Sequence, residues 1–348
     1  LYYKPGSLKA LNCTRGREAL YQFCAEQGVT HERCGKLVVA VTEAEVPALN
    51  ELERRGRANG LDGMLRIRGA ALQEYEPHVA GLEALWVPTT GIVDFPGVTE
   101  AYARLVIEAG SEVRTGARVV DVKRDGTELV VETLGGPVRA RNLVNCAGLQ
   151  SDRIARLCGL EPGVQIVPFR GEYYELVPEQ HHLVRNLIYP VPDPRFPFLG
   201  VHFTRMAKGG VEAGPNAVLA FRREGYHKLD FSLRDSVDMA TFPGFWRMAG
   251  KFWKTAAGEF HRSFSKEAFV TALQKLMPDI RAEHLKPGGA GVRAQAVTRE
   301  GALVDDFRIL ESESMIHVLN APSPAATASL SIGQTIAELA GKNFGLTR

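Results

Sequence analysis

A chain of 348 residues is longer than one compact core usually holds, so its length predicts two domains. With 45% hydrophobic and 24% charged residues it reads as a globular enzyme, and a net charge of +2 argues against a nucleic-acid binder. The 5 cysteines form no C-x-x-C pair, which indicates neither a metal site nor a disulfide framework and favours a reducing, cytoplasmic compartment. No stretch reaches the ~20 apolar residues of a membrane-spanning helix.

The first third of the chain alternates helices and strands. Ser7 can cap a helix that Gly28 terminates, because a hydroxyl accepts from the first free N–H groups and a glycine adopts the closing left-handed conformation. The next predicted elements are a strand at 35–41, a helix opened by the capping box of Thr42 and Glu45, and a helix at about 97–110.

The segment 117–157 is the most regular. It predicts two alternating strands around the turn Asp125-Gly126, a third strand into the small-residue turn 145–148, and a helix capped by Ser151. A strand, a small-residue turn and a helix in this order let backbone N–H groups face an anion such as a pyrophosphate. An ordinary βα turn is equally consistent with the residues.

Strand-like segments rich in proline and aromatic residues follow from 166 to 224, then a helical stretch over about 243–276, and finally a strand, a loop and a helix. This alternation of α/β units with a β-rich block predicts an α/β plus α+β fold whose two domains the chain visits more than once.

The stretch "GGAGVRAQA" at 288–296 matches the dinucleotide-binding pattern G-x-G-x-x-G/A. A genuine fingerprint follows a buried strand and opens a helix, whereas the flanks here predict no preceding strand and an extended chain afterwards. We therefore predict that these glycines permit a close backbone approach and that they present Arg293 to a ligand.

Near the C-terminus, Ser323-Pro324 predicts the cap and first residue of a helix with a face of small residues. Such a face can approach a flat ligand closely, and the positive end of the helix would stabilise an anion. A tightly packed terminal helix is an alternative interpretation.

Polar side chains interrupt the apolar strands of the β-rich block. Arg170 and Tyr173 flank a glycine, Tyr189 follows an apolar pair, and His202 lies in the strand "GVHFT". A histidine there is consistent with a hydrogen-bonded core residue as well as with a catalytic base. Guanidinium groups such as those of Arg170 and Arg293 suit carboxylate ligands.

The segment 244–260 predicts an amphipathic helix with two tryptophans and several basic residues. Such a helix can lie on an anionic membrane surface, and it can equally pack on its own domain.

Several motifs in collinear order resemble the L-2-hydroxyglutarate dehydrogenase/oxidase family of the FAD-dependent D-amino-acid-oxidase-like superfamily. The resemblance runs from Leu1 to about Ala340, and it rests on "YYKPGSLKA", "CGKLVVAV", "TGIVD", "NCAGLQSDRIA", "IVPFRGEY", "IYPVPDPRFPFLGVHFT", "GPNAVLAFRREGY", "GVRAQA" and "NAPSPAATAS".

The resemblance implies a Rossmann-type, glutathione-reductase-like FAD-binding domain and an interleaved β-rich substrate domain. It assigns residues 1–34, 95–165 and 286–348 to the FAD-binding domain and 35–94 and 166–285 to the substrate (cap) domain. Family members open with a strand–GxGxxG–helix unit that this sequence lacks. We therefore expect an FAD-binding domain that is incomplete at its N-terminus, with a truncated, cofactor-free and inactive fragment as an alternative.

The resemblance also implies which residues contact FAD. These are the strand residues Val119 and Val120, the turn Cys146, Ala147 and Gly148, and the loop Ser323, Pro324, Ala325, Ala326 and Thr327.

The implied reaction is the oxidation of (S)-2-hydroxyglutarate to 2-oxoglutarate by hydride transfer to FAD. Here His202 is the base, Arg293 and Arg170 bind the substrate carboxylates, and Tyr173 and Tyr189 add hydrogen bonds. An FAD-dependent oxidase of an amino acid or another 2-hydroxy acid is the alternative. The resemblance further implies a quinone or oxygen as electron acceptor and a peripheral inner-membrane contact through 244–260, mitochondrial in a eukaryote.

Overall fold

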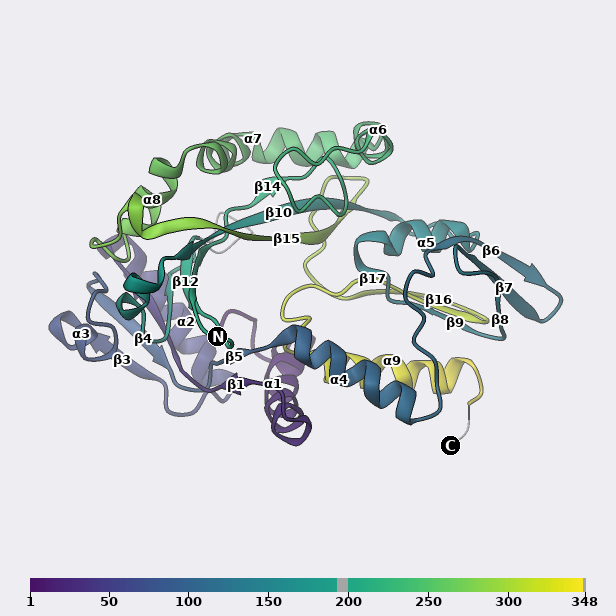
Figure 1. The fold of residues 1–348 in the computed structure, drawn as a ribbon, viewed down its shortest axis with the longest axis horizontal. Coiled ribbons are helices and arrows are strands. Elements are labelled where there is room, and N and C mark those ends of the chain that lie inside the picture. Colours follow the sequence, from purple (N-terminus) through teal and green to yellow (C-terminus); the bar gives the residue numbers. More distant parts are fainter. Residues whose placement is uncertain (193–199, 347–348) are drawn as a thin grey trace. The chain divides into compact units, whose positions relative to one another are not determined.

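The computed structural model describes residues 1–192 and 200–346, so the motif residues 193–199 lie outside the described part. The chain divides into two compact units, which it visits several times (Figure 1). Unit 1 contains Leu1–Val98, Arg170–Val218 and Lys254–Gly291, and unit 2 contains Thr99–Phe169, Leu219–Trp253 and Val292–Arg348. The predicted mixture of α/β and β-rich parts is confirmed. The predicted division into an FAD-binding and a substrate domain stays a prediction, and residues 1–34 belong to unit 1.

Unit 1 is built on a large mixed sheet with the strand order β14-β10-β13-β12-β11-β2-β4-β3, and β15 pairs with β10. The strands are β2 (Lys36–Ala40), β3 (Leu65–Arg68), β4 (Glu83–Val87), β10 (Val164–Leu176), β11 (Leu187–Pro190), β12 (His202–Arg205), β13 (Val211–Gly214), β14 (Val218–Leu219) and β15 (Leu285–Thr298). A separate pair joins β1 (His31–Glu32) to β5 (Ile92–Val93). The helices are α1 (Leu8–Gln27), α2 (Val46–Ala58), α3 (Leu72–Tyr75) and α8 (Lys266–Gln274).

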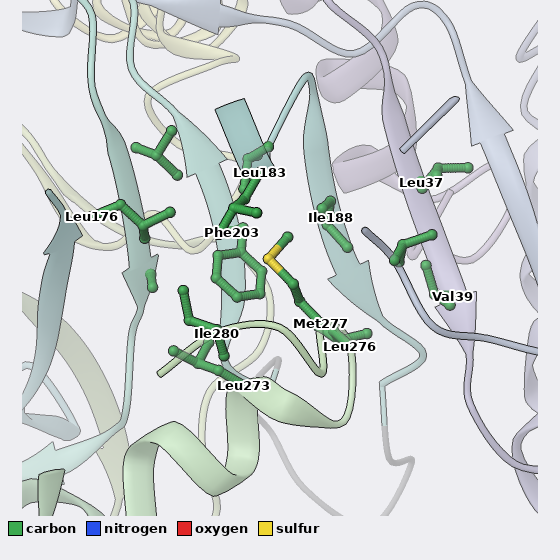
Figure 2. Packing of buried hydrophobic residues seen from close by; sticks show 14 of the residues in the cluster. Leu37, Val39, Leu176, Leu183, Ile188, Phe203, Leu273, Leu276, Met277 and Ile280 are labelled. Carbon is green, nitrogen blue, oxygen red and sulfur yellow. The ribbon is translucent and has the colours of Figure 1, made fainter. Parts of the chain in front are cut away.

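One face of this sheet carries the main core of unit 1 (Figure 2). Leu37 and Val39 of β2, Ile188 of β11 and Phe203 of β12 are fully buried there. They pack against the apolar face of α8 and the segment 276–280 that follows it. Because successive side chains of a strand point to opposite faces, the residues between these four belong to the other face of the sheet.

Unit 2 contains two smaller sheets, with the orders β6-β7-β8 and β16-β17-β9. Their strands are β6 (Val119–Asp125), β7 (Glu128–Thr133), β8 (Val138–Ala140), β9 (Leu143–Asn145), β16 (Arg308–Ser312) and β17 (Met315–Asn320). The helices are α4 (Phe95–Glu108), α5 (Ser151–Leu157), α6 (Leu233–Ala240), α7 (Pro243–Phe264) and α9 (Ser329–Asn343). The strands β10, β14 and β15 and the helices α4 and α7 each begin in one unit and end in the other.

Most predicted elements are confirmed, and three predictions need correction. Ser151 is the first residue of α5, because the 3-10 turn Gly148–Gln150 leads directly into the helix, and its hydroxyl donates to the Leu319 carbonyl instead. The C-terminal helix begins at Ser329, because Ser323–Ala328 forms irregular turns. The predicted extended chain after 297 is correct, but the glycine motif itself also lies inside a strand, β15.

Candidate active site

Three neighbouring strands of unit 1 bring polar side chains to one face of the sheet. Lys36 of β2 is paired with Leu187 of β11, and Leu187 is paired with Thr204 of β12. Paired residues share a face, and so do residues two apart along a strand. Lys36, Tyr189 and His202 therefore lie on the face opposite the core of Figure 2.

These side chains form a contact cluster. The rings of Tyr189 and His202 are stacked, with centroids 3.9 Å apart and an interplanar angle of 19°. The Lys36 ammonium lies 4.9 Å from the centroid of the Tyr189 ring and 4.6 Å from that of Tyr2. It also lies within 3.4 Å of the Tyr2 hydroxyl oxygen. We call Tyr2, Lys36, Tyr189 and His202 the polar cluster.

His202 is held as a neutral imidazole with a defined tautomer. Its Nδ1–H donates to the Gly200 carbonyl at 3.0 Å, because a carbonyl oxygen can only accept. This leaves the lone pair on Nε2. Burial, together with the positive charge of Lys36, lowers the pKa of His202 to about 4, although the hydrogen bond to Gly200 acts in the opposite direction. A neutral histidine with a free lone pair can accept a proton at neutral pH.

Lys36 is one of two cluster residues that sequence reasoning missed. Its side chain is only 8% exposed, and burial lowers its pKa to about 8. The sequence signal was present but weak, since "CGKLVVAV" places one lysine at the start of an otherwise apolar strand. Tyr2 was also missed, because nothing in a sequence shows that it meets the lysine.

Tyr173 and Arg170 lie on opposite faces of β10. Glu175 is paired with Glu212, which lies on the face of His202, so Tyr173 faces the same side, and burial raises its pKa to about 12. Arg170 is an odd number of residues away and contacts Glu172, to which Nη2 donates at 2.7 Å. The structure thus brings together Tyr173, Tyr189 and His202, whereas the predicted carboxylate role of Arg170 gains no support from its position.

Glu172 ties Arg170 into a buried network. Its other oxygen accepts from Asn216 Nδ2 at 2.8 Å and from the Ser263 hydroxyl at 2.7 Å. The charge of Arg170 is thus balanced within unit 1, and removing one partner would leave an uncompensated buried charge.

In unit 2, two of the predicted FAD-contacting segments leave one sheet at the same edge. β9 and β17 are parallel, with Leu143, Val144 and Asn145 paired to Met315, Ile316 and His317. Parallel strands end at the same edge of a sheet, where open α/β sheets bind their ligands. The turn 146–148 follows β9, and the loop 321–327 follows β17.

Asn145 shapes the first of these segments. Its side chain accepts from the Ala147 N–H at 3.0 Å and donates to the Ser151 carbonyl at 2.8 Å. It also lies 3.0 Å from Nδ1 of His317, and Asn145, Ser151 and His317 are all buried. The conformation of the turn therefore depends on one amide side chain.

The residues at this edge fit a flat cofactor. Cys146, Ala147 and Gly148 are exposed, and Gly148 has φ +51° with nothing within 4 Å of the position that a Cβ would occupy. In the second segment Ser323 and Ala326 are exposed and Ala325 is half-buried. No residue of α9 (329–343), which is described throughout, is fully buried, so a tightly packed terminal helix is not what the structure has.

Val119 and Val120 begin β6 in the other sheet of unit 2, and Val120 is exposed. Arg293 is exposed on the part of β15 that belongs to unit 2. The close backbone approach predicted for the glycine motif occurs at Gly288, where a Cβ would lie 3.0 Å from the Tyr173 carbonyl oxygen. The interpretation of this motif as a dinucleotide-binding turn is excluded.

The part of the helix predicted at 244–260 that belongs to unit 2 packs on that unit with one face and exposes the other. Phe245, Met248 and Phe252 belong to an apolar cluster of unit 2, whereas Trp246 and Trp253 are each 61% exposed. Among residues 1–192 and 200–346, no helix is long and apolar enough to cross a membrane.

Comparisons with known proteins agree with this organisation. Residues 1–339 match the family model described as FAD dependent oxidoreductase. The L-2-hydroxyglutarate dehydrogenase of Indibacter alkaliphilus is 53% identical over 345 residues, which cover 99% of this chain and 86% of that protein. The human mitochondrial L-2-hydroxyglutarate dehydrogenase is 42% identical over 364 residues, covering 99% and 78%.

Solved structures show the same fold. The FAD-bound L-alpha-glycerophosphate oxidase of Mycoplasma pneumoniae superimposes with a TM-score of 0.78 at 17% identity, covering 97% of this chain and 81% of that one. Glycine oxidase from Geobacillus kaustophilus gives a TM-score of 0.69, also at 17% identity, with 98% and 81% covered. With a family model over nearly the whole chain and relatives of such identity, this protein belongs to the FAD-dependent oxidoreductases and, among them, to the L-2-hydroxyglutarate dehydrogenase family.

Proposed function

We propose that this protein oxidises (S)-2-hydroxyglutarate to 2-oxoglutarate with FAD as its electron acceptor. The observation that carries the proposal is the 53% identity over 99% of the chain to an L-2-hydroxyglutarate dehydrogenase. In the balanced reaction C2 loses a hydride, the 2-hydroxyl loses a proton, and a carbonyl forms between them.

The residues proposed to hold FAD are those of the carboxyl edge of the β9–β17 sheet and of β6. Cys146–Gly148 offers exposed backbone, the loop Ser323–Thr327 offers small side chains, and Val119 and Val120 offer apolar contact. When bound, FAD supplies the two-electron acceptor for the hydride. The role of this chain is to present a flat surface of small residues to the cofactor. The side chain of Asn145 fixes the turn 146–148 within that surface.

We assign the removal of the hydroxyl proton to Nε2 of His202. The Gly200 carbonyl holds the Nδ1–H, and the stacked Tyr189 ring fixes the ring plane, so the lone pair has one direction. The lowered pKa of His202 keeps the imidazole neutral until the substrate proton arrives. Tyr189 and Tyr173 are protonated at neutral pH, since burial raises the pKa of both, and each can donate a hydrogen bond to the substrate.

Arg293 remains our candidate for one substrate carboxylate, because a guanidinium binds a carboxylate with two parallel hydrogen bonds. Arg170 was predicted for the second carboxylate. Its ion pair with Glu172 makes it the weaker of the two assignments.

The test is the rate at which the substrate reduces bound FAD under anaerobic conditions, followed by the loss of flavin absorbance. His202→Asn is expected to slow reduction by about 100-fold or more, since general base catalysis contributes about 10²–10⁴-fold. The control is His182→Asn, which changes an exposed histidine of unit 1. A normal rate in His202→Asn would show that the base is another group, and absence of reduction in the unmodified protein would refute the proposed substrate.

We further propose that electrons leave for a quinone at an anionic membrane surface that α7 contacts. Trp246 and Trp253 are exposed, and Arg247, Lys251 and Lys254 lie on the same helix. Unit 2 exposes more apolar side chains in the segment just before it, namely Phe221, Tyr226, Leu229, Phe231, Leu233 and Val237. An amphipathic helix and an apolar loop with basic neighbours are typical of contact with anionic lipid.

Co-sedimentation with vesicles that contain anionic lipid tests the contact. The double change Trp246→Glu and Trp253→Glu is expected to release the protein from the vesicles, and Leu229→Glu to weaken binding. Leu65→Glu is the control, because Leu65 is an exposed leucine of unit 1. Equal sedimentation of all variants would refute the membrane contact.

A further inference from the structure

Lys36 is a buried cation without an anion. Its side chain is 8% exposed, yet none of the described residues provides a carboxylate within ion-pair distance of Nζ. Two exposed lysines of the same unit do have such partners, since Lys208 pairs with Asp94 at 2.7 Å and Lys286 with Glu175 at 3.0 Å. Lys36 is buried and would gain more from a counter-charge than these exposed lysines, yet it has no carboxylate partner among the described residues.

The surroundings of Lys36 compensate only part of this deficit. Its ammonium group lies near the rings of Tyr2 and Tyr189 and near the Tyr2 hydroxyl. A cation–π contact of this kind is weaker than the desolvation penalty of a buried ion. Among aliphatic neighbours, Val38 and Val87 are buried on the same face.

The position of Lys36 points to the ligand that would supply the anion. The Tyr189 ring contacts both the Lys36 ammonium and the His202 imidazole. A molecule whose hydroxyl reaches His202 thus lies on the face of the sheet that carries Lys36, and the substrate of the proposed function carries two carboxylates. An ammonium group on the same face as the base can bind one of them as a charge-assisted hydrogen-bond donor.

We propose that Lys36 is a substrate-binding residue that forms an ion pair with one carboxylate of a 2-hydroxydicarboxylate whose hydroxyl lies at His202. This inference rests on the proposed function, and it adds a cation that neither the motif analysis nor the predicted arginines supply. In this proposal, a residue of unit 1 binds one of the two substrate carboxylates.

The experiment measures binding of glutarate, a dicarboxylate that cannot be oxidised at C2, to the FAD-loaded protein by isothermal titration calorimetry. Lys36→Met keeps the length of the side chain and removes its charge, and we expect about 10- to 100-fold weaker binding, the range for one charge-assisted hydrogen bond. Lys275→Met, a change of an exposed lysine in unit 1, is the control. Glutarate affinity within twofold of the unmodified protein in Lys36→Met would overturn the proposal.

A second measurement needs no variant. Glutarate affinity of the unmodified protein is expected to fall as the pH rises from 7 to 10, because the buried lysine loses its proton in this range and arginines do not. An affinity that stays constant to pH 10 would overturn the proposal even if Lys36→Met failed to fold.

The two proposals fail in different ways. Lys36-dependent glutarate binding without reduction of FAD by (S)-2-hydroxyglutarate would refute the proposed function and leave the ion pair standing. Reduction by (S)-2-hydroxyglutarate with glutarate binding that is independent of Lys36 would refute the ion pair and leave the function standing.

Discussion

Replacing Lys36 by methionine is expected to stabilise the ligand-free protein at neutral pH. Burial lowers the pKa of Lys36 to about 8, whereas an exposed lysine has a pKa of about 10.4. This difference corresponds to about 3 kcal/mol by which folding disfavours the protonated side chain. The two cation–π contacts offset part of this cost, at about 0.5–2 kcal/mol each, so the net gain of Lys36→Met is at most about 2 kcal/mol.

The sign of the pH dependence follows from the lowered pKa. The folded state binds the proton of Lys36 more weakly than the unfolded state, so the destabilisation is complete below pH 8 and disappears as the pH rises towards 10.4. The stability advantage of Lys36→Met should therefore be largest near pH 6.5 and should have fallen by most of its value at pH 10.

Urea unfolding at pH 6.5 and pH 10 measures this, with both proteins compared at each pH so that other titrating groups cancel. Lys275→Met reports on the loss of an exposed lysine and should show no such change. An advantage of Lys36→Met that is equal at the two pH values, or larger at pH 10, would refute the view that Lys36 is a desolvated cation.

Three further predictions concern unit 2. Asp152→Asn should destabilise the protein by about 3–5 kcal/mol in urea unfolding, because Arg223 is only 2% exposed and loses the anion that both of its terminal nitrogens contact. The control Asp121→Asn removes an exposed pair with Lys123 and should change the stability by less than about 1 kcal/mol, so equal effects of the two changes would contradict the prediction. Asn145→Ala should weaken FAD binding at least about tenfold in fluorescence titrations of apoprotein, since each polar group left unpaired costs about 1–3 kcal/mol. The control is Asn142→Ala, and an unchanged affinity of Asn145→Ala would show that the turn keeps its conformation without this side chain. Gly148→Ala should lower the stability by about 1–2 kcal/mol, because Gly148 has φ +51°, which disfavours a residue with a Cβ, while the Cβ itself would meet no atom within 4 Å. An unchanged stability in urea unfolding would mean that the turn relaxes to another backbone conformation.

Local signals in the sequence predicted the elements well. Ser7 caps α1 by accepting from the Ala10 N–H, and Gly28 ends it with φ +69°, as a hydroxyl cap and a left-handed glycine should. The hairpin of β6 and β7 turns at Asp125-Gly126. Both features depend on interactions within a few residues, and such interactions are readable from a single chain.

The failures lie where the outcome depends on register between strands. Arg170 and Tyr173 look like one polar pair in the sequence, but an odd spacing on a strand sends them to opposite faces of β10. Lys36 looks like the polar start of an apolar strand. It becomes part of a site only because β2 pairs in parallel with β11 and thereby brings it to Tyr189. Pairing of residues 151 positions apart, such as Lys36 and Leu187, has no local signature.

The same strands place core side chains on one face and the proposed substrate-binding side chains on the other. The free energy gained by burying the core side chains explains why unit 1 can accommodate a buried lysine. Leu37, Val39, Ile188 and Phe203 are fully buried, and each contributes about 1.5–3 kcal/mol relative to an exposed side chain. Together they outweigh the desolvation of Lys36, which comes to about 3 kcal/mol before its contacts with the tyrosine rings. Because the core residues alternate with Lys36 and His202 along β2 and β12, each strand that holds a polar group in place is itself anchored at the next residue. A substitution that empties the core face, such as Phe203→Ala, should therefore disturb the neighbouring His202 as well as the stability, whereas Lys36→Met should remove binding and leave the core intact.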